Sequence, residues 1–228
     1  MGALPPLPAA AAAPQVATSA ATTAAQAGLV DVATLAPGLA LDIRYAGSHN
    51  FVGRPIDGYQ AGKCLLLAPA AQALAQVQAD LRGQGLRLKL FDCYRPVRAV
   101  ADFLRWAGDP SAQDNKAEFY PDLDKARIVP EGYVAAVSGH SRGATVDLTL
   151  QRCVHGRCSD LDMGTGFDYF GTLANTDNAR VAPAQRGNRQ RLRAAMARRG
   201  FANYPKEWWH YTLTPEPSPG VQFDVPVR

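Results

Sequence analysis

The chain has 228 residues and a mass of 24.4 kDa; 47% of its residues are apolar and 19% are charged. A chain of this length and composition can bury a sizeable core in one large or two small domains, which excludes a wholly disordered protein. Its formal net charge is only +4, and no run of five like charges occurs, so nucleic acid is not an expected partner.

The N-terminal segment differs in composition from the rest of the chain. Residues 1–28 contain twelve Ala and four Pro, and the first charged residue is Asp31. We predict a flexible tail over residues 1–29, followed by a single folded domain over residues 30–228. The prolines exclude a membrane-spanning helix there. Because a basic n-region is missing, the tail is interpreted as what remains after signal-peptide removal, as an artificial start, or as the leader of a cytoplasmic protein.

Apolar periodicity predicts a mixed order of helices and strands along the remainder of the chain. The order shows no regular alternation of strand and helix, which favours an α+β fold with a central antiparallel sheet and flanking helices. The predicted strands are 30–35, 41–45, 86–91, 144–150 and 208–213, and the predicted helices are 70–81, the segment opened by Pro96, and 185–199.

Four cysteines are present, and two of them, Cys153 and Cys158, flank a loop of four residues. Cys64 precedes the apolar run 65–67 and Cys93 follows the predicted strand 86–91, so neighbouring strands would bring these two together. We therefore predict the disulfides Cys64–Cys93 and Cys153–Cys158, which favour a periplasmic or secreted protein over a cytoplasmic one. The alternatives are buried thiols, or a metal site of Cys153, His155 and Cys158, which offers fewer ligands than structural zinc requires.

Two of the four histidines lie near acidic residues in unusual segments. His140 stands before Gly143 and seven residues before Asp147, which lies in the predicted strand 144–150. A bend at Gly143 could turn both side chains toward one point. His210 follows Glu207 after two tryptophans, at the start of the last predicted strand, so Glu207 must reach the site from the strand's beginning or from a bulge.

Two imidazoles and one carboxylate form a catalytic type of zinc site, in which the fourth position is left to water. A second carboxylate nearby can then act as a general base in metal-assisted peptide hydrolysis. Taken singly, a histidine in a loop or a group of aromatic residues is more often structural. Together, in a chain with few histidines, the two segments favour a metal site, although spacing alone leaves open which of Asp147 and Glu207 is the ligand.

The segments 138–147 and 207–210 resemble the zinc D-alanyl-D-alanine dipeptidases of the VanX type, within the wider group of D-Ala-D-Ala metallopeptidases related to lysostaphin and hedgehog folds. The resemblance covers about residues 30–213, and segment 151–161, which contains two cysteines, departs from it. It implies a hedgehog-like or D-Ala-D-Ala peptidase-like fold. Further matching segments occur in the family's order: 41–45, 50–55, 92–96, 148–150 and 163–168.

The resemblance implies a role for each residue of the predicted metal site. By this comparison His140, Asp147 and His210 are the ligands of one zinc ion per chain, and Glu207 is the general base. Arg95 corresponds to the family's arginine at the end of a strand. A fixed and permanently charged guanidinium at that position would stabilise the oxyanion of the tetrahedral intermediate.

The resemblance also assigns Tyr45, Ser138 and Asp168 to binding of a small dipeptide, with Asp168 as the counter-ion of its ammonium group. Without it, these residues would be interpreted as a core tyrosine, a capping serine and a solvated aspartate. The implied activity is hydrolysis of D-Ala-D-Ala to D-alanine, in cell-wall precursor metabolism or glycopeptide resistance. One alternative is a murein D,D- or L,D-carboxypeptidase or endopeptidase with the same zinc site. Another is a non-catalytic, zinc-stabilised binding module. No obligate protein partner is expected.

Overall fold

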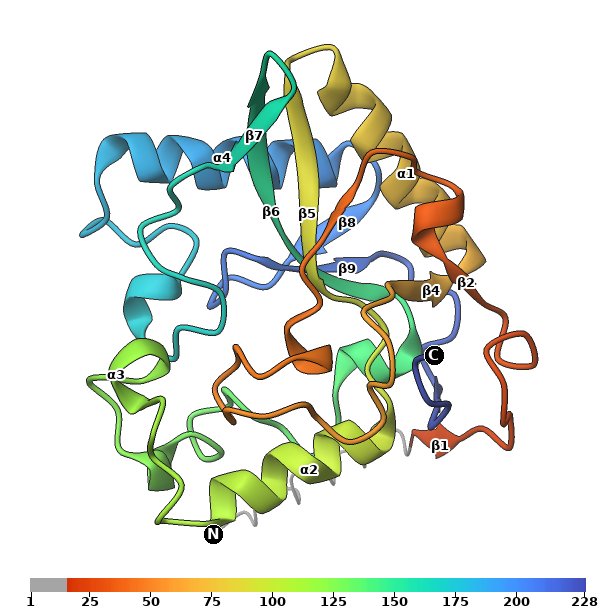
Figure 1. The fold of residues 1–228 in the computed structure, drawn as a ribbon, viewed down its shortest axis with the longest axis vertical. Helices are drawn as coiled ribbons and strands as arrows, with labels where there is room; N and C mark the ends of the chain where they lie inside the picture. Colours follow the sequence, from red (N-terminus) through yellow and green to blue (C-terminus); the bar gives the residue numbers. More distant parts are fainter. Residues whose placement is uncertain (1–15) are drawn as a thin grey trace, which may run out of the picture.

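The computed structural model describes residues 16–228 and contains four helices and ten strands in that range (Figure 1). The helices are α1 (Ala68–Arg82), α2 (Val97–Gly108), α3 (Lys116–Phe119) and α4 (Pro183–Ala197). The strands are β1 (Ala17–Thr18), β2 (Leu29–Asp31), β3 (Ala40–Leu41), β4 (Leu65–Leu67), β5 (Leu86–Asp92), β6 (Thr145–Val154), β7 (Arg157–Asp160), β8 (Phe201–Asn203), β9 (His210–Leu213) and β10 (Val221–Gln222).

The main sheet has the order β3-β5-β6-β9-β8, and β7 pairs with β6. All of its pairs are antiparallel except β3 with β5, which is parallel. The α+β fold with one central sheet is thus confirmed, with a short parallel edge as the difference from an all-antiparallel sheet. In β5 the alternating residues Leu86, Leu88 and Leu90 are all buried. A strand directs alternate side chains to the same face, so this conformation places all three leucines in the core.

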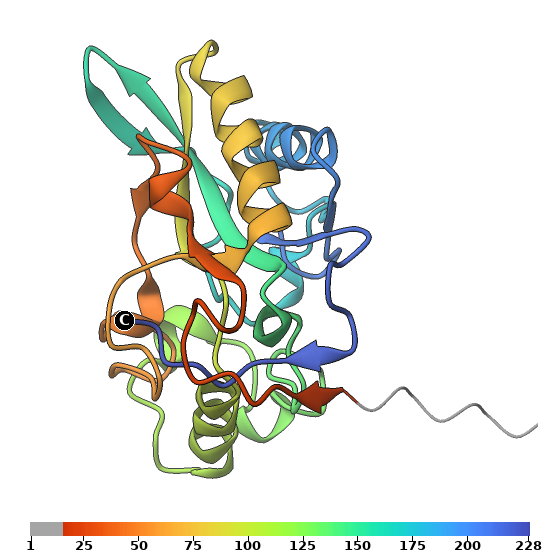
Figure 2. The same ribbon diagram turned by 90° about the vertical axis from the view of Figure 1, so that its right-hand side faces the viewer.

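Helices α1 and α4 lie beside each other on one face of the main sheet, whereas α2 lies at the opposite end of the molecule (Figures 1 and 2). In α1, residues Ala70, Leu74, Val77 and Leu81 recur at helical spacing, and all four are fully buried. Burial of each leucine or valine side chain stabilises the fold by about 1.5–3 kcal/mol. Helix α1 is therefore stabilised mainly by burial of its apolar face against the main sheet.

Three predicted strands are shorter than expected. The segment 30–35 is a strand only as far as Asp31, whose side chain accepts a hydrogen bond from the Ala33 amide and starts a 3-10 turn. The segment 41–45 likewise ends in a 3-10 turn that contains Tyr45. The last predicted strand begins at His210 instead of residue 208, because the residues before it form a turn.

Both ends of the described chain lie against the domain. Strand β1 pairs with β10, and the two are neighbours at the lower right of Figure 2. Ala27, within the segment expected as a tail, is buried. Residues 1–15 lie outside the described part of the chain.

The C-terminal segment that begins with β10 packs behind the turn that carries His140. The Phe223 amide donates a hydrogen bond to the Ser141 carbonyl at 2.8 Å, and the Tyr94 hydroxyl donates to the Val225 carbonyl at 3.0 Å. Phe223, Val225 and Tyr94 are buried. We call residues 221–227 the C-terminal strap.

All four cysteines form disulfides, in the two predicted pairs Cys64–Cys93 and Cys153–Cys158. The first pair is buried and joins the residue before β4 to the residue after β5. The second pair closes the β6–β7 hairpin, which projects from the top of the molecule in Figures 1 and 2. Because the sulfurs of Cys153 and Cys158 are bonded to each other, the alternative interpretation of Cys153, His155 and Cys158 as a metal site is wrong.

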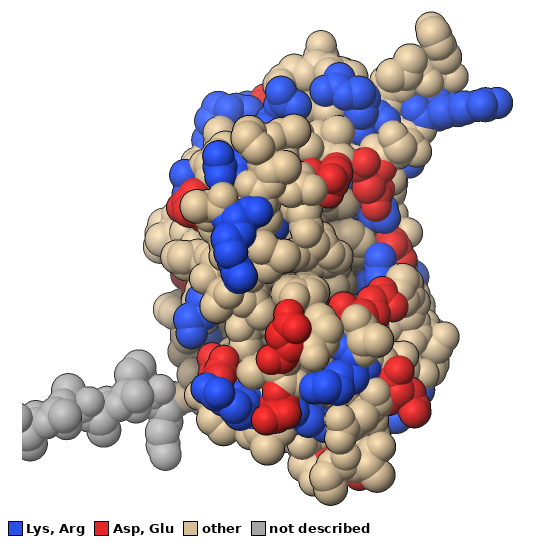
Figure 3. Space-filling view, turned by 90° about the vertical axis from the view of Figure 1, so that its left-hand side faces the viewer, with Lys and Arg blue, Asp and Glu red and all other residues tan. Residues whose placement is uncertain are grey.

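Within residues 16–228, no helix is long and apolar enough to cross a membrane. Positive and negative side chains are interspersed on the face shown in Figure 3, in agreement with the small net charge of the chain.

Candidate active site

Three side chains meet where β6 and β9 lie side by side. Asp147 of β6 and His210 of β9 are direct cross-strand partners in the antiparallel register. His140 comes from the 3-10 turn Gly139–Arg142, which ends at Gly143 with a positive φ of 74°. A Cβ atom at Gly143 would approach a Leu29 methyl group to 2.9 Å, so only glycine fits this bend.

The donor atoms of these residues form a small triangle. His140 Nε2 lies 3.3 Å from His210 Nδ1 and 3.3 Å from Asp147 Oδ2, and His210 Nδ1 lies 3.1 Å from Asp147 Oδ1. Two ligands bound tetrahedrally at ordinary zinc–nitrogen distances are about 3.3 Å apart. His140, Asp147 and His210 could therefore hold one metal ion without rearrangement.

Hydrogen bonds behind the triangle orient its members for metal binding. His140 Nδ1 lies 2.7 Å from the Cys93 carbonyl oxygen, which can only accept, so Nδ1 carries a proton and Nε2 is the ring nitrogen that faces the cavity. Asp147 Oδ1 is buried, and although His210 Nδ1 lies 3.1 Å away, no described residue makes a well-directed hydrogen bond to it. Burial alone would raise the pKa of Asp147, but His140 and His210 hold it well below its usual range. An anionic, unsatisfied oxygen is what a cation requires.

Glu207 reaches the site from the turn before β9, in which its amide donates to the Tyr204 carbonyl and the His210 amide donates to the Glu207 carbonyl. Its Oε2 lies 3.5 Å from His210 Nδ1. Burial, the largest effect, raises the pKa of Glu207 to about 7. A carboxyl group whose pKa is close to neutral pH can both take up and release a proton during a reaction.

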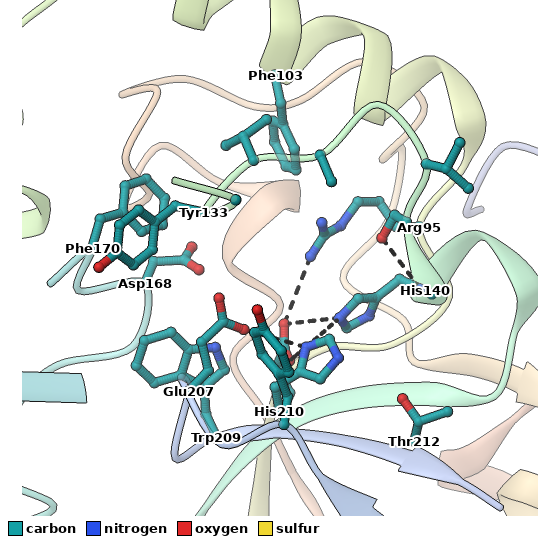
Figure 4. A pocket seen from close by; sticks show the side chains of 18 of the residues that line it. Arg95, Phe103, Tyr133, His140, Asp168, Phe170, Glu207, Trp209, His210 and Thr212 are labelled. Atoms are coloured by element: carbon teal, nitrogen blue, oxygen red, sulfur yellow. Dashed lines mark hydrogen bonds and ion pairs between the residues drawn. The ribbon is translucent and has the colours of Figure 1, made fainter. Parts of the chain in front are cut away.

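Arg95 lies across the cavity from Glu207 (Figure 4). Its Nε donates to Asp92 Oδ2 at 3.0 Å, and its Nη2 lies 2.9 Å from the same oxygen and 3.7 Å from Asp147 Oδ2. The guanidinium also stacks 5.0 Å from the centre of the Phe103 ring. Asp92 is fully buried and its other oxygen accepts from the Tyr59 hydroxyl at 2.5 Å. Arg95 is therefore held in one orientation.

Sequence reasoning missed Asp92 as a supporting residue. The signal was available, since Asp92 directly follows the predicted strand 86–91, three residues before Arg95, and a carboxylate that is buried at the end of a strand needs a cationic partner. Asp92 Oδ2 also lies 3.4 Å from His140 Nδ1, so one buried carboxylate contacts both the arginine and a histidine of the triangle.

Asp168 stands at the other end of the cavity from His140 (Figure 4). It is only 5% exposed and has a positive φ of 59°, which is unusual for a residue other than glycine. Its Oδ2 accepts a hydrogen bond from the Tyr45 hydroxyl at 2.8 Å. Burial, followed by the charge of Asp147, raises the pKa of Asp168 well above its usual range. Among the described residues no cation forms an ion pair with it, so this carboxylate suits a cationic ligand.

All eight side chains predicted for the metal, the chemistry and substrate binding line one cavity of about 360 Å³. Ser138 is among them, and its hydroxyl oxygen accepts from the His140 amide at 3.3 Å. The other two histidines lie elsewhere: His49 is exposed and pairs with Glu118, and His155 is at the tip of the β6–β7 hairpin. The predicted site residues are His140, Asp147, His210, Glu207, Arg95, Tyr45, Ser138 and Asp168.

Comparisons with known proteins agree with this geometry. The family model described as D-ala-D-ala dipeptidase matches residues 25–228. A D-alanyl-D-alanine dipeptidase of Streptomyces coelicolor is 44% identical over 193 residues, which cover 85% of this chain and 95% of the relative. Proteins with the same description from Enterococcus faecium and Escherichia coli are 38% and 37% identical, over 84% and 81% of this chain and 94% and 84% of those relatives.

Proposed function

This chain is a peptidase of the D-ala-D-ala dipeptidase family, and on that premise we propose that it hydrolyses D-Ala-D-Ala to two molecules of D-alanine with one bound zinc ion. The observation that carries the proposal is the content of one cavity: a triangle of metal-ligand atoms at one end and a buried carboxylate without a cation at the other. A free dipeptide has an amide bond and an ammonium group close enough together to meet both.

We propose His140, Asp147 and His210 as the zinc ligands. Two imidazole nitrogens and one carboxylate oxygen are a common donor set of catalytic zinc, and this set leaves a coordination position open. Zinc bound there would polarise the scissile carbonyl and make water easier to deprotonate. The hydrogen bond from His140 Nδ1 to the Cys93 carbonyl orients the ring so that Nε2 is the nitrogen available to a metal.

Glu207 is the proposed general base. Its carboxylate takes the proton of the attacking water and later gives a proton to the nitrogen of the departing D-alanine. A pKa of about 7 in the protein without metal suits both transfers, and a nearby cation would favour the ionised form further. Glu207 lines the cavity, and its Oε2 lies 3.5 Å from His210 Nδ1, so its carboxylate is close to the proposed metal position.

Arg95 is proposed to stabilise the negative charge that develops on the carbonyl oxygen. Because Asp92 and the Phe103 ring fix its guanidinium, little reorganisation is needed when that charge appears. A permanently charged group is suited to this role because it cannot lose its proton to the reacting atoms.

Asp168, Tyr45 and Ser138 are proposed to hold the dipeptide. The Asp168 carboxylate would pair with the ammonium group, and the pKa of the Tyr45 hydroxyl is raised by burial, so it remains a donor to Asp168. The Ser138 hydroxyl accepts from the His140 amide and still has a proton to donate to the substrate. An ammonium partner compensates the desolvation of Asp168, which favours short substrates with a free amine.

The two disulfides favour a site of action outside the cytoplasm, in the periplasm or after secretion. There the enzyme would act on D-Ala-D-Ala that is released during cell-wall metabolism.

The test is release of amino acids by the zinc-loaded protein from D-Ala-D-Ala, L-Ala-L-Ala, N-acetyl-D-Ala-D-Ala and a murein pentapeptide. We expect cleavage of D-Ala-D-Ala that a chelator abolishes. A Glu207→Gln variant should keep one zinc per chain while its turnover falls by roughly 10²–10⁴. Preferred cleavage of the pentapeptide would overturn the dipeptidase proposal in favour of a carboxypeptidase, and zinc loss in the variant would make Glu207 a ligand.

A further inference from the structure

The loop that presents Asp168 has little regular structure of its own. Between the end of β7 at Asp160 and the 3-10 turn that starts at Thr172, no residue belongs to a helix or strand. Asp168 itself has a left-handed backbone conformation, which is unfavourable for a non-glycine residue and persists only when the surroundings impose it. Something outside the loop must therefore hold it.

Arg189 of α4 makes the contacts that can do so. Its side chain is completely buried, and its three nitrogens donate to three backbone carbonyls. Nε donates to Met163 at 2.7 Å, Nη1 to Asn175 at 2.7 Å, and Nη2 to Leu173 at 3.1 Å. Within residues 16–228 no carboxylate forms an ion pair with it, and burial lowers the pKa of Arg189 to about 10.

A buried guanidinium without a carboxylate partner is costly, so its retention needs a reason. Asp168 lies five residues after Met163 and five before Leu173, the two carbonyl groups that Arg189 holds on either side. The planar fork of the guanidinium therefore ties the start of the loop to its end, which closes residues 163–175 into a ring. Closing the loop restricts the positions open to the residue at its middle.

We propose that Arg189 is a positioning residue for substrate recognition: it clamps the loop 163–175 so that Asp168 points into the cavity. The inference rests on the proposed role of Asp168 as the partner of the substrate ammonium group. Arg189 forms no hydrogen bond with the proposed metal ligands or with Glu207, so the zinc content should be unaffected. The loop does accept hydrogen bonds from Trp208, the neighbour of Glu207, at the Ala174 carbonyl and the Thr165 hydroxyl, so a small change in kcat can accompany the larger effect on recognition.

Steady-state kinetics of the zinc-loaded Arg189→Met variant test the clamp. We expect KM for D-Ala-D-Ala to rise by about 10- to 100-fold while kcat changes by less than about threefold, because a misplaced anchor weakens substrate binding. The zinc content should not change. The KM of Arg189→Lys, which keeps the charge but not the planar guanidinium, should lie between those of the unmodified protein and Arg189→Met. This variant provides the test if Arg189→Met does not fold. Arg193→Met is the matched control, since Arg193 is on the same helix but pairs with Asp177 at the surface.

A double-mutant cycle separates positioning from general stability. If Arg189 acts through Asp168, Arg189→Met should have almost no further effect on KM in an Asp168→Ala background. The proposal would be overturned if Arg189→Met raised KM by the same factor with Asp168 present and with Asp168→Ala. It would also be overturned if Arg189→Met lowered kcat and the zinc content together.

Amide hydrogen exchange provides a measurement that does not depend on the substrate. Residues 163–175 should exchange faster in Arg189→Lys than in Arg193→Lys, whereas β6 and β9 should be equally protected in both. Equal exchange of the loop in the two variants would refute the clamp. If the wild-type protein does not cleave D-Ala-D-Ala, the proposed function fails, and this exchange experiment still decides the structural part of the inference.

Discussion

At one end of the cavity Asp147 and His210 are cross-strand partners in the main sheet, whereas at the other end Asp168 stands on a loop without helix or strand. In the sheet, backbone hydrogen bonds fix the relative position of the two side chains, and a shift by one residue would turn them to opposite faces. In the loop, the position of Asp168 depends on side-chain contacts from Tyr45 and Arg189.

This difference separates the chemistry from the choice of substrate. The metal-ligand triangle cannot be displaced without disturbing β6 or β9, which are at the centre of the fold. The loop can be altered by changing one or two side chains while the sheet stays intact. We therefore expect substitutions at the metal end to change metal content and kcat, and substitutions at the loop end to change KM and substrate preference.

The largest effect is expected at the metal end. His210→Ala should abolish stoichiometric zinc binding and reduce hydrolysis to background, because the remaining His140 and Asp147 provide only two ligands. Metal analysis of the purified protein measures this directly. The exposed His49 is the control, and His49→Ala should keep one zinc per chain and full activity. Full zinc content in His210→Ala would show that the metal lies elsewhere.

At the loop end we expect a smaller and more selective effect. Asp168→Asn should lower kcat/KM for D-Ala-D-Ala by about 30-fold or more, the equivalent of about 2 kcal/mol for one member of a buried charge pair. Cleavage of the N-acetylated dipeptide should change little, because it has no ammonium group. If both substrates lose activity equally, Asp168 does not act as the ammonium anchor.

The pH dependence sharpens the same comparison. Since the pKa of Asp168 is raised, the group is a neutral acid until the pH exceeds that raised value, and only the carboxylate above it can pair with an ammonium ion. KM for D-Ala-D-Ala should therefore fall as the pH rises through the pKa of Asp168, and Asp168→Asn should remove this dependence. A KM that varies with pH in the same way in the Asn variant would contradict the role.

The smallest effects on activity are expected at the two disulfides, which differ mainly in what they contribute to stability. Loop-closure entropy predicts a loss of about 3.5 kcal/mol in the free energy of unfolding for Cys64→Ala/Cys93→Ala and about 2 kcal/mol for Cys153→Ala/Cys158→Ala. Because the Cys93 carbonyl accepts from His140, only the first pair should also weaken zinc binding. Chemical denaturation and zinc titration of both variants provide the test, and equal zinc affinities would show that the first disulfide does not support the metal end.

The sequence predicted those parts of the fold that have a strong periodicity. The expected helix 70–81 is α1 and the expected strand 86–91 is β5, each within two residues of the observed bounds. Tyr45 was expected on a strand and lies on a 3-10 turn, because a few apolar residues do not reveal where a short strand ends. The pairing of Asp147 with His210 depends on strand register, and residues 63 positions apart carry no local signal of it.

The candidate site shows the same limit. The residue types at His140 and His210 indicated a metal site, but the resemblance to a known family was needed to distinguish ligand from base. Arg189 could not be recognised, since it is one of several arginines in a basic amphipathic helix and sequence favours an exposed position for all of them. Only the structure shows that it turns inward to three carbonyl groups.

The C-terminal strap has a consequence for when the enzyme becomes functional during its synthesis. Its Phe223 amide donates to Ser141, the neighbour of His140, and its Val225 packs against Tyr94, the neighbour of Arg95. While Phe223 and Val225 of a nascent chain are still inside the ribosome or a translocation channel, the segments that carry His140 and Arg95 lack these contacts. The site would therefore be completed only once residues 221–227 have left the ribosome or the channel and have packed against the domain.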